Sequence, residues 1–182
     1  MANKFMDSRT KDILRVITPY LKIGDRIIDI GSGDCTVAKN LRKKGYKITP
    51  LDVKDKSVHQ NIRPTIYDGQ SMPFPDNSFD VALLITVLHH TKKPVEVLRE
   101  TLRVAPRIIV MEDLYESIFQ KYLTFIMDSL LNLEFFGHPH TNMTERQWEG
   151  VFKKLGLKII DRNIHNFWRF FISGTFYLEK VK

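Results

Sequence analysis

The sequence predicts a three-layer α/β fold, in which a mostly parallel sheet of seven strands lies between two layers of helices. Short apolar runs alternate with amphipathic stretches along most of the chain, which is typical of parallel strands joined by helical crossovers. A strand-like run over 26–30 enters a turn with two glycines and then a helical pattern. The last two extended runs have no helix between them, so we expect them to pair as an antiparallel hairpin at one edge.

The individual elements follow from apolar periodicity and from the residues that end each segment. In the first half we expect a helix over 7–20, a strand over 26–30, a helix over 35–44, a strand over 47–51 and a short strand over 63–67. In the second half we expect a strand over 79–88, a helix over 94–104, a strand over 107–111, a helix over 144–155 and strands over 157–161 and 169–178. The connection between Asp52 and Arg63 has room for about one helical turn, which is short for a parallel crossover.

Length and composition indicate a single domain over 1–182, as a monomer or a homodimer. Cys35 is the only cysteine, which excludes an intramolecular disulfide and a cysteine zinc site. The longest apolar run is too short to span a bilayer and the first residues lack the apolar segment of a secretory signal, so we expect a cytoplasmic protein. The formal charge of +7 is spread along the chain, which leaves a nucleic-acid partner possible but not favoured.

The turn in I28-D-I-G-S-G-D-C raises the question of which ligand it holds. A dinucleotide site needs a third glycine where Thr36 stands, and Asp34 would repel a pyrophosphate at the start of the helix. No G-K-S or G-K-T follows, which excludes a P-loop. The glycines still permit close approach of a ligand, and Asp29 and Asp34 favour one with cationic and hydroxyl groups. Asp34 is equally typical of a helix N-cap.

Acidic residues also follow the next two predicted strands. Asp52 closes the second strand and Asp68 closes the third. Because ligands of open parallel sheets bind beyond the carboxyl ends of the strands, we expect both side chains to face the same site as the glycine turn. A carboxylate at the end of the second strand can accept hydrogen bonds from both hydroxyls of a ribose.

Together these segments resemble the class I S-adenosylmethionine-dependent methyltransferases, and more narrowly the methyltransferase type 11 group that includes ubiquinone and menaquinone biosynthesis enzymes. The matching segments, in family order, are I28-D-I-G-S-G-D-C, L51-D-V, D68-G-Q-S-M-P-F-P-D-N-S-F-D-V, V87-L-H-H and V97-L-R-E-T-L-R-V. The resemblance covers 26–111 and implies a Rossmann-like fold with S-adenosylmethionine as methyl donor. Two departures stand out: Cys35 replaces the third glycine of the first motif, and the D/N-P-P-Y motif of enzymes that methylate base amino groups is absent.

The resemblance also implies which residues bind this cofactor. Gly31 and Gly33 would lie against its methionine part, and Asp29 would contact its ammonium through water. Asp52 would hold the ribose, and Asp68 would accept a hydrogen bond from the adenine amino group. The cofactor-binding residues implied in this way are Asp29, Gly31, Ser32, Gly33, Asp52, Val53, Asp68, Gly69, Gln70 and Thr86.

Candidate catalytic residues follow the central strand. His89 and His90 would lie near the reactive methyl, where a histidine could take a proton from a hydroxyl or thiol acceptor near neutral pH. The same pair is also expected as a structural cap of the strand. Glu112, at the end of the next strand, could orient a polar acceptor. No metal site is expected, because His138 and His140 are only part of a ligand set.

The segment over 114–140 carries a wide apolar face at helical spacing. We expect a helical lid insertion there that covers a small apolar or aromatic acceptor, with a helix packed on the sheet or in a dimer interface as the alternative. The predicted acceptor-binding residues are His90, Glu112, Phe119, Tyr122 and His138.

The sequence therefore predicts a methyltransferase that acts on a small molecule. An RNA or protein methyltransferase is the alternative that the basic charge favours, and a cofactor-binding scaffold without turnover is the non-enzymatic one. An oxidoreductase with a nicotinamide cofactor is last, because Thr36 and Asp34 do not fit its phosphate site.

Overall fold

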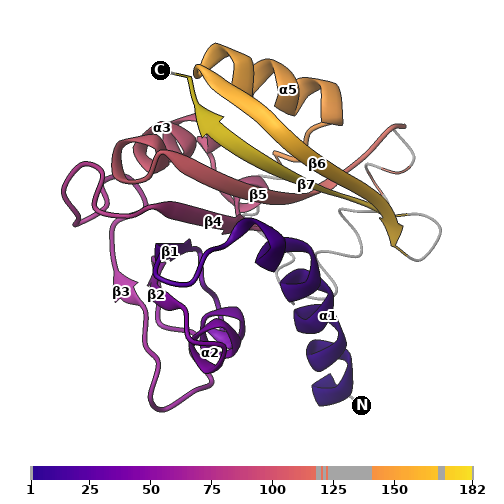
Figure 1. Ribbon diagram of the computed structural model, residues 1–182. Coiled ribbons are helices and arrows are strands. Elements are labelled where there is room, and N and C mark those ends of the chain that lie inside the picture. The colour runs from indigo at the N-terminus through magenta and orange to yellow at the C-terminus, as the bar shows by residue number, and fades with distance from the viewer. Residues whose placement is uncertain (1, 118–119, 121, 123–140, 168–170, 182) are drawn as a thin grey trace.

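The computed structural model of the chain is a seven-stranded sheet with helices on both faces (Figure 1). It describes residues 2–117, 120, 122, 141–167 and 171–181. The strand order is β3-β2-β1-β4-β5-β7-β6, in which β7 runs antiparallel to both of its neighbours, β5 and β6. The predicted three-layer fold and its C-terminal hairpin are confirmed.

The helices and strands follow one another in the predicted order. In the first half they are α1 (Ala2–Ile17), a 3-10 turn (Thr18–Tyr20), β1 (Arg26–Ile30), α2 (Thr36–Lys43), β2 (Lys47–Asp52) and β3 (Thr65–Ile66). In the second half they are β4 (Val81–Ile85), a 3-10 turn (Leu88–His90), α3 (Pro94–Val104), β5 (Arg107–Leu114), α5 (Glu145–Lys154), β6 (Leu157–Phe167) and β7 (Phe171–Lys180).

Several predicted boundaries were wrong, among them the start of α1 and the end of β5, and for two others the reason is local. The strand expected over 79–88 ends at Ile85, because Thr86 adopts a left-handed φ of 50°. β6 continues six residues beyond the predicted end at Asp161, since β7 supplies backbone partners to polar residues that the apolar pattern did not mark as strand. The connection over 53–64 contains a turn but no helix, and Ser57 braces it by donating to Ile62 O (2.6 Å).

Each face of the sheet has its own apolar core. Helices α1 and α2 cover one face, where Ile17 and Leu41 are fully buried. Helices α3 and α5 cover the other, where Trp148 and Phe152 of α5 stack and Phe152 meets Phe176 of β7 edge-on. Burial on both faces explains why the central strands read as continuous apolar runs.

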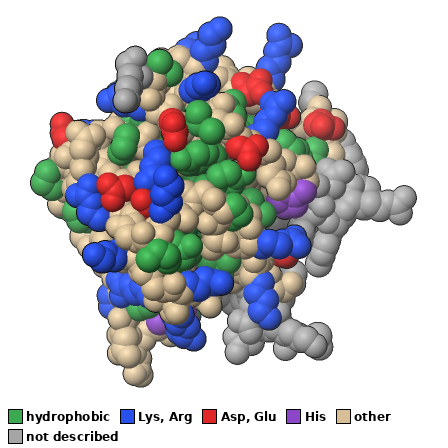
Figure 2. All heavy atoms as spheres, in the orientation of Figure 1, with side chains coloured by type: hydrophobic (Ala, Val, Ile, Leu, Met, Phe, Trp, Pro, Cys, Tyr) green, Lys and Arg blue, Asp and Glu red, His purple; other side chains and the backbone are tan. Residues whose placement is uncertain are grey.

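The face of the molecule seen in Figure 2 carries charges of both signs. Figure 2 shows Lys and Arg side chains scattered over the visible face, with acidic and apolar side chains between them. Among the helices that the structure describes, none is long and apolar enough to cross a membrane.

Candidate active site

The strand order reverses between β1 and β4, which places the switch point of the sheet beside the glycine turn. The N–H groups of Gly31 and Ser32 both donate to Leu51 O, at 2.8 and 3.1 Å, and so join the turn to the end of β2. Gly31 has a φ of 73°, and a Cβ there would lie 2.1 Å from Val87 Cγ2. A side chain at this position would therefore collide with the loop that follows β4.

Cys35, which stands where the resemblance has a glycine, adopts a left-handed backbone conformation. It is fully buried with a φ of 61°, a left-handed value that favours glycine. Its N–H donates to Ser32 O (2.9 Å), and the next N–H, of Thr36, donates to Asp34 Oδ1 (2.8 Å). The N-cap of α2 is Cys35, so Asp34 is not the N-cap that the sequence allowed for; it precedes the N-cap and accepts from the first N–H of the helix.

Three carboxylates gather around this turn. Asp29 in β1 is 3% exposed, and its Oδ2 has no hydrogen-bond partner among the residues that the structure describes. Burial first, and then the charges of Asp52 and Asp34, raise the pKa of Asp29 to about 7. Asp52 accepts from Gly33 N (2.8 Å) and Lys54 N (3.2 Å). Such a cluster of carboxylates can attract a cation or accept hydrogen bonds from hydroxyl groups, and it repels phosphate.

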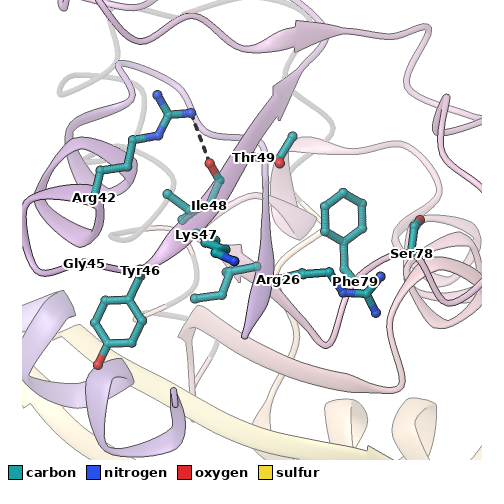
Figure 3. A pocket seen from close by; sticks show the side chains of 10 residues that line it. Arg26, Arg42, Gly45, Tyr46, Lys47, Ile48, Thr49, Ser78 and Phe79 are labelled. Carbon is teal, nitrogen blue, oxygen red and sulfur yellow. Dashed lines mark hydrogen bonds between the residues drawn. The ribbon is translucent and has the colours of Figure 1, made fainter. Parts of the chain in front are cut away.

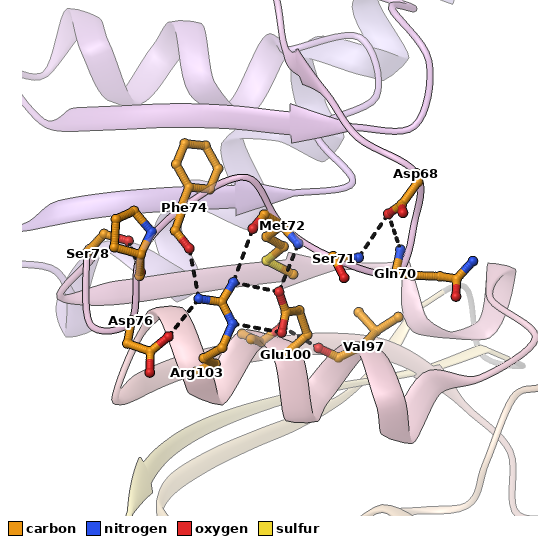
Figure 4. Close-up of polar contacts among 12 residues, drawn as sticks. Asp68, Gln70, Ser71, Met72, Phe74, Asp76, Ser78, Val97, Glu100 and Arg103 are labelled. Atoms are coloured by element: carbon orange, nitrogen blue, oxygen red, sulfur yellow. Dashed lines mark hydrogen bonds and ion pairs between the residues drawn. The ribbon is translucent and has the colours of Figure 1, made fainter.

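The predicted adenine side lies at the end of β3. Asp68 Oδ1 accepts from the N–H groups of Gln70 and Ser71 at 2.8 Å, and these bonds lower the pKa of Asp68 (Figure 4). Gly69 has a φ of 80°, and a Cβ on it would lie 3.3 Å from Val53 Cγ1. The structure therefore brings together two predicted cofactor residues, Val53 and Gly69, from the segments that follow β2 and β3.

An arginine on α3 holds the turn that follows Asp68 (Figure 4). Arg103 donates to Phe74 O (2.8 Å), Met72 O (3.1 Å) and Asp76 Oδ1 (2.8 Å), and pairs with Glu100 (2.6 Å). Glu100 in turn accepts from Met72 N (2.8 Å). Met72 itself is 4% exposed and belongs to the apolar core, so it fits the core-packing role that the sequence also allowed.

His89 and Glu112 form a buried unit beneath the mouth of the site. Glu112 is fully buried, and its Oε1 accepts from the N–H groups of Val87 (2.9 Å) and Leu88 (2.7 Å). Its Oε2 lies 2.5 Å from Nδ1 of His89, which is 1% exposed. The ring of His90 lies 4.1 Å from that of His89 and is only half-buried. Glu112 therefore braces the loop that carries His90, and of the two histidines His90 is the more accessible.

Arg9 is a site residue that the sequence did not reveal. Its Nη2 donates to Thr86 Oγ1 (3.2 Å), at the carboxyl end of β4. The two residues are 77 positions apart, and nothing in the local pattern distinguishes Arg9 from the other cations of α1. The N-terminal helix thus places a positive charge at the predicted reaction site.

The acceptor-binding predictions are only partly covered by the described residues. Phe119 and His138 lie outside them, as does most of the predicted lid over 114–140. Tyr122 is described and is 60% exposed. The chain is described again from Thr141, whose N–H donates to His89 O (3.2 Å) and whose hydroxyl donates to Leu88 O (3.1 Å).

Thr141 therefore lies against the loop over 88–91, which carries His89 and His90. Within the described ranges no three His, Cys, Asp or Glu side chains are grouped as a metal site would require. His138 and His140, the histidines considered for such a site, lie outside those ranges.

Comparison with known proteins shows what this part of the chain is similar to. The model of the family described as "Methyltransferase domain" matches residues 28–107. A ubiquinone/menaquinone biosynthesis C-methyltransferase of Azotobacter vinelandii is 30% identical over 107 residues, which are 49% of this chain and 42% of that protein. A tRNA (carboxymethyluridine(34)-5-O)-methyltransferase of Schizosaccharomyces pombe is 32% identical over 110 residues, which are 57% of this chain and 48% of that protein. The chain spans about half the length of the curated relatives it matches, or less.

Solved structures share the fold at low identity. The magnesium protoporphyrin IX methyltransferase of Synechocystis PCC 6803, with bound S-adenosylhomocysteine, superposes with a TM-score of 0.69 at 15% identity and covers 96% of this chain and 83% of that one. The [4+2]-cyclase SpnF superposes with a TM-score of 0.70 at 16% identity and covers 96% and 80%. The sheet order, the glycine turn with its carboxylates and the matched domain agree: over residues 28–107 the chain is similar to the class I S-adenosylmethionine-dependent methyltransferases, and it shares their fold.

Proposed function

We propose that this chain binds S-adenosylmethionine at the carboxyl ends of β1, β2 and β4 and transfers its methyl group to a small-molecule acceptor. The observation that carries the proposal is the buried, unpartnered Oδ2 of Asp29 beside the Gly31 turn. A buried carboxylate oxygen without a partner is costly unless a ligand supplies a donor or a positive charge. The ammonium of the cofactor would supply both.

We assign described residues to each of the three parts of this cofactor. Asp29, Gly31 and Gly33 would hold its methionine part, Asp52 its ribose hydroxyls and Asp68 its adenine. When bound, the cofactor supplies an activated methyl on a sulfonium, which passes to a nucleophilic atom of the acceptor while the acceptor loses a proton. The chain contributes positioning of the two reactants and exclusion of water.

On the acceptor side we assign different roles to the residues near β4. His90 is proposed to touch the acceptor and to receive its proton where the acceptor atom carries one. His89 and Glu112 are proposed to position that loop, because their polar atoms bind each other and the backbone. Arg9 and Thr86 would favour an acceptor with an acidic or anionic group beside its apolar or aromatic body.

The experiment that tests the function uses the purified chain with isotopically labelled S-adenosylmethionine and a metabolite extract. Mass spectrometry should find at least one small molecule that gains the labelled methyl group, with formation of S-adenosylhomocysteine. Binding of the cofactor with no turnover on any acceptor would instead support a scaffold role, and tighter binding of NADH than of S-adenosylhomocysteine would remove the cofactor assignment.

Asp52→Ala should weaken S-adenosylhomocysteine binding by about 1 to 3 kcal/mol, because the ribose hydroxyls lose a charged acceptor in a buried setting. Asp55→Ala is the matched control, since Asp55 is an exposed carboxylate three residues further along. Calorimetry on both variants measures the difference. Equal affinity of the Asp52 variant and the parent would contradict the ribose assignment.

An RNA methyltransferase is the second candidate function, since the chain is basic and one relative is named as a tRNA methyltransferase. This alternative predicts RNA binding whose affinity falls steeply with salt. A gel-shift series at increasing salt, combined with the labelled donor and total tRNA, separates it from the small-molecule proposal. The single domain over 1–182, the cytoplasmic location and the oligomeric state stay predictions.

A further inference from the structure

A pocket of about 510 Å³ lies at the opposite ends of the strands from the site described above (Figure 3). It sits at the amino ends of β1 and β2, next to the end of α2. Its volume falls within the range of small-molecule sites. The residues that line it are Arg26, Ile27, Arg42, Gly45, Tyr46, Lys47, Ile48, Thr49, Ser78 and Phe79, and none of them has a role in the proposed methyl transfer.

The rim of this pocket is cationic. Arg26 and Lys47 are register partners at the first positions of β1 and β2, so they start neighbouring strands that lie about 4.8 Å apart. Arg42 comes from the last turn of α2, where a positive charge also meets the partly negative end of the helix. None of the ten lining residues is a carboxylate.

Two of the three cations have no carboxylate of the described chain as partner. Arg26 is neutralised, because its guanidinium forms an ion pair with Asp80 (2.9 Å). Arg42 donates only to the carbonyl of Ile48 (3.1 Å), which fixes its guanidinium without cancelling its charge. For Lys47 the described residues supply no ion pair and no side-chain hydrogen bond. The pocket therefore offers positive charge that nothing nearby in the described chain compensates.

The lining also includes apolar residues, and we call Ile27, Ile48 and Phe79 the floor of the pocket. Ile27 is fully buried, and Ile48 and Phe79 are 5% and 7% exposed. Tyr46 and Thr49 add an aromatic ring and a hydroxyl at the side, as Figure 3 shows. An apolar floor beneath a cationic rim matches a ligand that has a flat apolar body and one anionic end.

We propose that this pocket is a second ligand site, which binds a small organic anion with its ring on Ile48 and Phe79 and its phosphate or carboxylate at Lys47 and Arg42. β1 has five residues, so its two ends are about 15 Å apart and both sites can be filled at once. The proposal stands on the pocket itself and does not require the methyl-transfer function.

The test uses AMP as the probe, with the protein saturated by S-adenosylhomocysteine so that the cofactor site is blocked. Backbone amide shifts in NMR titrations should move over 42–49 and 78–79. Lys47→Gln and Arg42→Gln should each weaken AMP binding by about threefold to tenfold, as expected for one partly exposed ionic contact. Lys43→Gln is the matched control, because Lys43 is an exposed cation beside Arg42 that does not line the pocket.

Adenosine lacks the anionic group and inorganic phosphate lacks the ring, and both are titrated in the same way. Both should bind at least several-fold more weakly than AMP. Equal binding of adenosine and AMP would remove the role of the cations, and equal binding of phosphate and AMP would remove the role of the floor. A Lys43 variant that loses as much affinity as the Lys47 variant, or shifts confined to the carboxyl ends of the strands, would also overturn the proposal.

Discussion

Glu112→Ala is expected to lower the free energy of unfolding by about 3 to 5 kcal/mol, the cost of removing one partner from a buried ionisable pair. The carboxylate is fully buried and satisfies Val87 N, Leu88 N and His89 Nδ1. Alanine leaves all three donors inside the protein without an acceptor, and each unsatisfied group costs free energy. Chemical denaturation of the parent and the variant measures the difference.

Glu112→Gln separates the backbone bonds from the bond to the histidine. Its amide oxygen can still accept from Val87 N and Leu88 N, so we expect a smaller loss of stability than with alanine. If Glu112 positions the loop that carries His90, the folded glutamine variant should bind S-adenosylhomocysteine like the parent but turn over more slowly. A Glu112→Ala variant as stable as the parent would show that this buried unit does not support the loop.

Asp29→Asn is expected to change how stability depends on pH. The pKa of Asp29 is about 7 in the folded chain, against about 4 for an unfolded aspartate. Between pH 4 and pH 7 Asp29 is therefore protonated in the folded chain and ionised in the unfolded chain. The folded chain without ligand therefore loses stability as pH rises from about 4 to 7, and above pH 7 the loss is complete, on the order of 4 kcal/mol. Asparagine carries no proton to lose, so this part of the pH dependence should disappear.

Denaturation curves at pH 5 and pH 8 check this expectation. The Asp29 variant should gain stability relative to the parent at pH 8, and should gain only about a third as much at pH 5, where the loss in the parent has just begun. Asp55→Asn serves as the control, because Asp55 is an exposed carboxylate and should show no such gain at pH 8. A parent protein whose stability does not fall between pH 5 and pH 7 would contradict the raised pKa.

Cofactor affinity should respond in the opposite direction. An ionised Asp29 attracts an ammonium group more strongly than a protonated one, so the parent should bind S-adenosylhomocysteine more tightly as pH rises from 6 to 8. In Asp29→Asn the affinity should be lower at pH 8, by about tenfold or more for a lost buried ionic contact, and nearly flat over this range. Calorimetry at the two pH values gives both results, and equal pH profiles would remove the role of Asp29.

Much of the fold could be predicted because its signals are local. The strands β1 and β4 are marked by apolar runs, and glycines mark the ends of neighbouring elements. Both signals depend only on side-chain types within a few positions. The same holds for the start of α5, where Thr144 and Gln147 form a capping box. The end of β4 at Ile85, just before Thr86, and the polar half of β6 were missed, because a left-handed residue and an edge-strand pairing leave no periodic pattern in the sequence.

For the candidate site, the sequence by itself determined that Asp29, Asp52 and Asp68 would lie at or near the carboxyl ends of three strands. This placement needs only the period and direction of each strand. The tertiary structure alone decided that Asp29 has an unpartnered oxygen, that Glu112 and His89 bind each other across 23 positions, and that Arg9 reaches Thr86. These facts depend on strand order and on which groups packing removes from water, and residues so far apart in the chain share no local pattern that could encode them.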